Sequence, residues 1–170
     1  MSTAAAVRAV PIETGKVARR RVLRFHSLDE ALTEAERLAA AERAGRLTRL
    51  GNWTLGQALG HLATWTEFAY TGVPLKPPFF IRWILRFRKR RLIEGPLPAG
   101  VKIPNVKGGT LGTERLPLEE GLSRYRRVLE RLRVEAPTAP SPIFGRMTHE
   151  ESIALTLRHS ELHLGFFVPA

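Results

Sequence analysis

Apolar residues recur at helical spacing in four stretches of the chain. Three of these stretches open with serine or threonine followed three positions later by glutamate or glutamine, the signature of a capping box at a helix N-terminus. They predict helices over about residues 27–44, 54–70 and 148–167. A fourth helix is expected to begin near Pro117, because leucine and tyrosine recur every three or four residues beyond it. The pattern therefore predicts an all-α protein built on a four-helix bundle.

About 45 residues separate the second and third predicted helices, too many for a simple turn between bundle neighbours. A connection of this length can cross over the bundle, so these two helices need not be antiparallel neighbours. Within it, residues 79–93 predict an extra short helix that lids a site or covers one end of the bundle. No strand is expected beyond an extended segment at residues 22–25.

The net charge of +11 comes from two segments of the chain. Residues 1–25 contain six basic side chains and one acidic one, and residues 82–91 contain six basic side chains and no acidic one. The remainder is neutral, so the basic character does not by itself indicate a nucleic-acid-binding domain. We expect a basic N-terminal tail over residues 1–24 and one helical domain over residues 25–170.

The composition narrows the chemistry that is available to the protein. A chain of 170 residues is long enough for one domain with a sizeable core. It contains no cysteine, which excludes disulfides and thiolate metal sites. No apolar run is as long as a membrane span, and the N-terminus lacks the apolar region of a secretory signal. We therefore expect a cytoplasmic protein.

Three histidines are placed for a metal site, with His61 on the second predicted helix and His159 and His163 on the last. Residues four apart share a helix face, and this pair falls inside the apolar arc of its helix. Buried imidazoles must be hydrogen-bonded or coordinated. Three of them can bind zinc, nickel or iron and leave a coordination position open.

Catalytic residues beyond the metal ligands are not specified by the sequence. Ser160 stands where zinc proteases of the H-E-x-x-H type have their glutamate base. Glu161 lies opposite the histidines by helical angle and is predicted to be a solvated surface residue. Gln57 is interpreted as a capping-box residue rather than a residue that orients a ligand, and Glu67 is a candidate fourth ligand. The remaining histidines, His26 and His149, are expected to be structural or exposed.

Several motifs resemble those of the DinB-like four-helix-bundle superfamily, which is unrelated to the DNA polymerase that shares the name. Residues 53–62 (WTLGQALGHL) look like its tryptophan-to-histidine stretch, and residues 158–164 (RHSELHL) match its late histidine pair. The segments 20–28 and 51–53, together with 158–164, look closer still to an uncharacterised branch. The resemblance spans roughly residues 20–168.

This resemblance implies a divalent metal held by His61, His159 and His163. Some members of the superfamily transfer or isomerise substrates with low-molecular-weight thiols such as bacillithiol or mycothiol, whereas others have no assigned reaction. We therefore expect a metal-dependent hydrolase or thiol S-transferase acting on a small molecule. A homodimer is a further expectation for its assembly.

The alternative is a non-enzymatic binding module that uses residues 79–93. This segment mixes aromatic and basic side chains, as segments that bind membrane surfaces, nucleic acids or protein partners do. In one continuous helix, however, Arg88 and Arg91 would intrude on the apolar arc. The sequence alone therefore favours a helix packed on the bundle with its cations in water.

Overall fold

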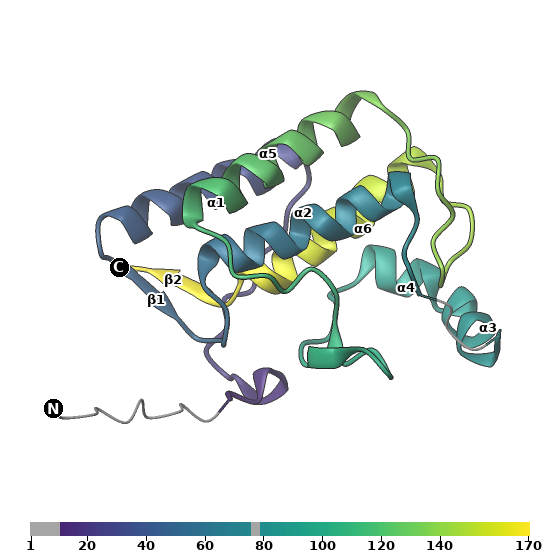
Figure 1. Ribbon diagram of the computed structural model, residues 1–170, viewed down its shortest axis with the longest axis horizontal. Coiled ribbons are helices and arrows are strands. Elements are labelled where there is room, and N and C mark those ends of the chain that lie inside the picture. The colour runs from purple at the N-terminus through teal and green to yellow at the C-terminus, as the bar shows by residue number, and fades with distance from the viewer. Residues whose placement is uncertain (1–10, 76–78) are drawn as a thin grey trace, which may run out of the picture.

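The computed structural model describes residues 11–75 and 79–170, and much of this part of the chain is helical (Figure 1). The stretches with helical spacing all form long helices, which confirms the predicted helical class. The long helices are α1 (Leu28–Arg43), α2 (Leu55–Thr71), α5 (Leu118–Val134) and α6 (His149–Leu164). The shorter elements are η1 (Thr14–Lys16), β1 (Leu47–Arg49), α3 (Phe79–Phe87), α4 (Lys89–Glu94), η2 (Lys107–Gly109) and β2 (Phe167–Pro169).

The three predicted N-caps are all present. Ser27, Thr54 and Thr148 each accept a hydrogen bond from the backbone N–H three residues on, which satisfies one of the free donors of the first turn. In α6 the glutamate also accepts from the cap backbone, which completes the capping box. These local interactions explain why the helix starts could be placed from sequence.

The long connection between α2 and α5 lets these two helices pack side by side in parallel. Gly56 contacts Gly121 near both N-termini, and the Tyr70 hydroxyl donates to the Glu135 carbonyl near both C-termini. A Cβ atom at Gly121 would overlap the Gly56 carbonyl oxygen, so glycine is required for this close approach. The expectation that the second and third long helices need not be antiparallel is thus confirmed.

Aliphatic side chains from all four long helices fill one core, and α6 packs against both α1 and α2. Tyr125 of α5 is completely buried, and its hydroxyl donates to Ser160 Oγ of α6 at 2.6 Å, while Ser160 itself donates to the Thr156 carbonyl. The most deeply buried leucines are Leu38, Leu55, Leu59, Leu62, Leu129, Leu132 and Leu164.

A small two-stranded sheet was not predicted. β1 and β2 pair antiparallel, with Leu47 opposite Pro169 and Arg49 opposite Phe167. The last helix therefore ends at Leu164 rather than near residue 167, because the chain turns there and residues 167–169 extend along β1. Residues 22–25 form no strand with any described residue.

The predicted helix over residues 79–93 is two helices, α3 and α4, separated at Arg88. α4 packs against α6, its Ile93 is buried, and an ion pair joins Lys89 to Glu151 of α6, with 2.6 Å between nitrogen and oxygen. α3 projects from the end of the molecule (Figure 1). No helix in the described ranges is both long and apolar enough to cross a bilayer.

Candidate metal centre

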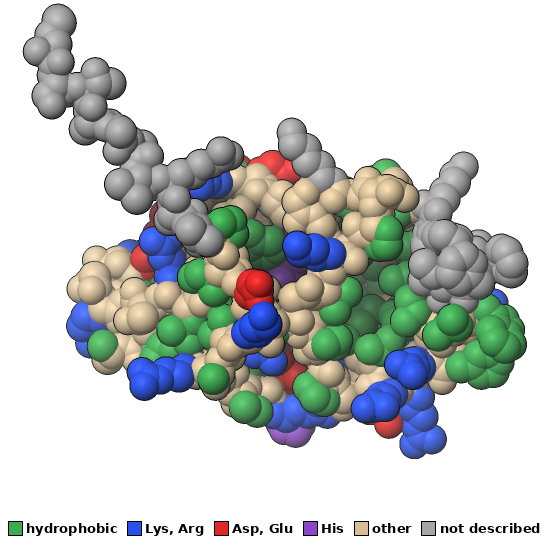
Figure 2. Space-filling model, turned by 90° about the horizontal axis from the view of Figure 1, so that it is seen from below, with side chains coloured by type: hydrophobic (Ala, Val, Ile, Leu, Met, Phe, Trp, Pro, Cys, Tyr) green, Lys and Arg blue, Asp and Glu red, His purple; other side chains and the backbone are tan. Residues whose placement is uncertain are grey.

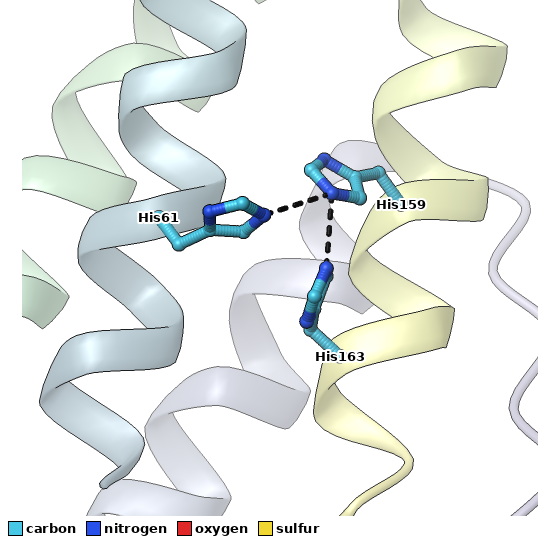
Figure 3. Close-up of side chains that lie close together, drawn as sticks. All are labelled: His61, His159 and His163. Carbon is cyan, nitrogen blue, oxygen red and sulfur yellow. Dashed lines mark hydrogen bonds between the residues drawn. The ribbon is translucent and has the colours of Figure 1, made fainter. Parts of the chain in front are cut away.

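The structure brings together the three histidines that the sequence selects. His61 extends from α2, and His159 and His163 extend from successive turns of α6 toward it (Figure 3). The Nε2 atoms of His61 and His159 are 3.2 Å apart, and those of His159 and His163 are 3.0 Å apart. The shared position of these side chains between α2 and α6 is therefore as expected for one site.

The spacing of two of the three nitrogen pairs is that of ligands around one metal ion. Zinc–nitrogen bonds of about 2.0–2.1 Å at tetrahedral angles place two ligand nitrogens about 3.3 Å apart. The candidate ligand atoms of the three residues all lie within 4.8 Å of one another. Side-chain movements that bring the outermost of these atoms closer together would let all three hold one ion.

A hydrogen bond to the backbone fixes the orientation of His61. Its Nδ1 lies 2.8 Å from the Leu111 carbonyl oxygen, which can only accept, so Nδ1 carries the proton and Nε2 presents a lone pair to the cluster. Metal-binding histidines commonly donate their other ring nitrogen in this way. The Leu111 carbonyl is thus a positioning group that the sequence did not reveal.

The segment that supplies this carbonyl is itself held by Gln57. The Thr54 hydroxyl accepts from the Gln57 backbone, but the Gln57 side chain donates to the Thr113 carbonyl at 2.8 Å. The interpretation of Gln57 as a reciprocal capping-box residue is therefore wrong. Its side chain instead ties the chain beside Leu111 to the first turn of α2, one turn before His61.

Hydrogen bonds alone cannot satisfy three neutral rings in this arrangement. If Nε2 of His159 carries a proton, it can form a full hydrogen bond with only one of its two neighbours. If it carries a lone pair instead, it faces the lone pair of His61 at 3.2 Å. A cation bound to all three lone pairs removes this conflict, because each nitrogen then has a partner.

Burial keeps the three imidazoles in the form that binds metals. Desolvation lowers the pKa of His61 to about 4, and it also holds the pKa values of His159 and His163 well below the ordinary value of 6.5. Repulsion between the rings when charged adds to this effect, and Arg20 further lowers the pKa of His163. All three side chains are therefore neutral at pH 7.

These pKa values predict that the metal-free protein loses stability in mild acid. The folded state resists protonation of His61 until about pH 4, whereas an unfolded histidine takes up a proton near pH 6.5. The stabilising contribution is complete above pH 6.5 and is lost as the pH falls, by up to about 1.4 kcal/mol per pH unit for each such histidine. Urea unfolding at a series of pH values should show this slope, and His61→Gln should reduce it. A free energy of unfolding that is constant between neutral pH and the acid range would contradict the prediction.

Two tryptophans line the centre. The Trp53 ring stacks on His163 with 5.2 Å between ring centroids and 11° between planes, and it also contacts His61. Trp65 presents its ring edge-on to His61 and His159, with centroids 6.1 Å away in both cases. The view from below shows histidine atoms in a recess beside a hollow lined by hydrophobic side chains (Figure 2). Neither tryptophan was assigned to the site from the sequence: Trp53 belongs to the motif at residues 53–62, and Trp65 was not singled out.

Carboxylates are absent from the cluster of candidate ligand atoms among the described residues. Glu67, the candidate fourth ligand, lies instead 3.5 Å from Arg124 in an ion pair between α2 and α5. His26 and His149 also lie outside the cluster, His26 exposed and His149 2.5 Å from the Leu132 carbonyl through its Nε2. The ligand set that the described residues offer is therefore three histidines.

Glu161 contradicts the prediction that it is a solvated surface residue. Its side chain is 7% exposed, and its carboxylate pairs with Arg158 at 2.5 Å while accepting the Phe25 N–H at 2.6 Å. Arg158 in turn donates to the Phe25 carbonyl. Arg158 and Glu161 do lie away from the histidines, but the segment before α1 covers that side of α6. Both side chains therefore contribute to packing and not to the metal centre.

The chain belongs to a family described as a protein of unknown function (DUF1569), whose family model matches residues 17–170. This match covers all of the centre and every α-helix described above, α1 to α6. No curated protein and no solved structure matches the chain. The family therefore brings no assigned reaction, and the function must be argued from the geometry of the site.

Proposed function

We propose that the protein binds a divalent metal ion (zinc, nickel or iron) through His61, His159 and His163 and uses it to transform a small molecule. The observation that carries this proposal is the convergence of three imidazoles, with the Nε2 of His159 3.2 Å from that of His61 and 3.0 Å from that of His163, and with His61 oriented by the Leu111 carbonyl. Neutral imidazole is a good ligand for all three metals.

We also propose that the fold is a DinB-like four-helix bundle. Four long helices share one core, a long connection joins the second and third, and the histidines occupy the helices that the resemblance assigns to them. The sheet of β1 and β2 and the division between α3 and α4 are additions to that plan. The resemblance is what suggests a low-molecular-weight thiol as a substrate.

Three protein ligands suit a reactive centre better than a purely structural one. Structural zinc sites are usually closed by four protein ligands, whereas catalytic sites keep a position for water or substrate. A bound metal would lower the pKa of a water molecule or thiol in that position and so produce a nucleophile at neutral pH. Hydrolysis and thiol transfer share this requirement, and the described residues fit both.

The protein itself would contribute orientation and exclusion of water. Leu111 and Gln57 fix the position of His61, and the rings of Trp53 and Trp65 cover the histidines on their apolar sides. The indole Nε1 of Trp65 is buried and has no hydrogen-bond partner among the described residues. It would be available as a donor to a polar group of a small molecule in the centre.

The test is the spectrum of the cobalt-substituted protein. We expect one cobalt per chain and visible bands that change when a thiol, imidazole or azide is added, because these ligands would occupy the open position. The spectra of His149→Ala, which lacks a histidine outside the cluster, should respond in the same way. Thiol that perturbs the bands and is consumed with an electrophilic co-substrate would favour transfer, whereas turnover of esters or amides without thiol would favour hydrolysis. A spectrum that none of the three ligands changes would contradict a reactive centre.

A further inference from the structure

The break at Arg88 creates a short helix whose faces are cleanly separated. Trp83, Ile84 and Phe87 lie within about 100° of one another around α3, since each residue advances a helix by about 100°. Arg88 and Arg91, which would interrupt this face in one continuous helix, lie beyond α3 at the break and in α4. In the folded protein, Arg88 and Arg91 therefore do not interrupt the apolar face, and α3 is amphipathic.

This apolar face is turned to solvent rather than to the core. Trp83 is 65% exposed, Ile84 49% and Phe87 73%. The rings of Trp83 and Phe87 contact each other edge to face, with 4.7 Å between centroids. Within the described residues, the main neighbour of α3 is α4. Figure 2 shows the resulting cluster of hydrophobic side chains at one end of the molecule, next to basic ones.

Unpaired cations flank the apolar face. Arg86, Arg88 and Arg91 are exposed and form no ion pair with any described residue. Two neighbouring cations are paired, Lys89 with Glu151 and Arg90 with Glu94. Because residues 82–91 contain no acidic side chain, the local field is strongly positive.

We propose that α3 and the unpaired arginines, here called the docking segment, bind the surface of an anionic lipid membrane. Amphipathic helices insert an apolar face at the level of the lipid headgroups, where tryptophan is favoured, while nearby arginines attract anionic headgroups. The nine residues of α3 are enough to lie in this interface and too few to span a bilayer.

The composition of the face favours a membrane over a nucleic acid. Proteins that bind single-stranded nucleic acids stack the bases on aromatic side chains, whereas an aliphatic side chain has no flat face for a base to stack on. Ile84 lies beside the two rings on the same face of the helix and is about half exposed, so this face resembles an insertion surface more than a stacking platform. Since α4 packs against α6 and is joined to it by the Lys89–Glu151 ion pair, binding of α3 would also orient the bundle on the membrane.

The test is co-sedimentation of the full chain with vesicles of phosphatidylcholine alone or mixed with phosphatidylglycerol. We expect binding to the mixed vesicles and little to the neutral ones. Replacing Arg86, Arg88 and Arg91 with glutamine should weaken binding roughly 100-fold, at about one kcal/mol for each basic residue near an anionic surface. Trp83→Ser combined with Phe87→Ser should also weaken binding. The binding that remains should be more sensitive to added salt, because it would depend on charge alone.

A matched control removes three exposed cations elsewhere, Lys102, Arg115 and Arg146, and so gives the same net charge. An equal loss of binding in this variant would overturn the proposal, because it would show a general effect of charge. Binding that survives both docking-segment variants would point to the N-terminal tail and would also overturn it. So would tighter binding to single-stranded DNA than to vesicles, or a dimer in solution that Trp83→Ser dissociates.

Discussion

Replacing His163 with alanine is expected to abolish stoichiometric metal binding while leaving the helical fold intact. Loss of a partner that only orients a metal ligand typically costs 10–100-fold in affinity, so loss of a direct ligand should cost at least about 100-fold. The Nε2 of His163 is one of the three that converge, and it lies 3.0 Å from that of His159. Elemental analysis after gel filtration measures the effect directly.

The fold should survive because the hydrophobic core is filled by other side chains and does not include His163. The main loss is the stacking of Trp53 on the imidazole, and such aromatic contacts contribute about 0.5–1.5 kcal/mol. The far-ultraviolet circular dichroism should therefore match that of the unsubstituted protein. His149→Ala is the matched control and should keep its metal. Stoichiometric metal in the His163→Ala protein would remove this residue from the ligand set.

The helices and the histidine cluster were predictable because their signals are local. Each N-cap of α1, α2 and α6 involves residues three positions apart. The pairing of His159 with His163 follows from one helical turn. The position of His61 on the apolar side of α2 follows from the same periodicity, and the resemblance added the link between the two helices.

Features that depend on distant segments could not be predicted in this way. The Leu111 carbonyl that orients His61 lies fifty residues further along the chain, and nothing in its sequence marks it. The strands β1 and β2 have three residues each and come from distant parts of the chain, too short to show a period of two. The break at Arg88 separates two helices within what reads as one apolar pattern.

The misplacement of Glu161 has a specific physical cause. A surface helix usually buries only one face, so the face of α6 opposite the histidines was predicted to lie in solvent. α6 instead packs on both sides, since residues near Phe25 cover its other face through Arg158 and Glu161. Two opposite charges three residues apart, such as Arg158 and Glu161, look the same in the sequence whether the pair is exposed or buried.

Replacing Glu161 with alanine is accordingly expected to lower the free energy of unfolding by about 3–5 kcal/mol, because it leaves the buried Arg158 guanidinium unpaired. It also leaves the Phe25 N–H without its acceptor. Urea unfolding with an unchanged m-value would measure this loss. The control is Glu36→Ala, which breaks a half-exposed pair with Arg126 and should cost no more than about 1 kcal/mol.

A double replacement, Arg158→Met with Glu161→Leu, separates the cost of an unpaired charge from the value of the pair. Buried ion pairs are offset by the desolvation of both groups, so apolar residues of similar volume often restore stability. We expect the double variant to recover much of the stability lost in Glu161→Ala. The Phe25 N–H would still lack its acceptor and the Phe25 carbonyl would newly lose the Arg158 donor, which limits the recovery by about 1–3 kcal/mol for each group left unsatisfied. Equal losses in Glu161→Ala and Glu36→Ala would show that the pair on α6 is not buried in solution.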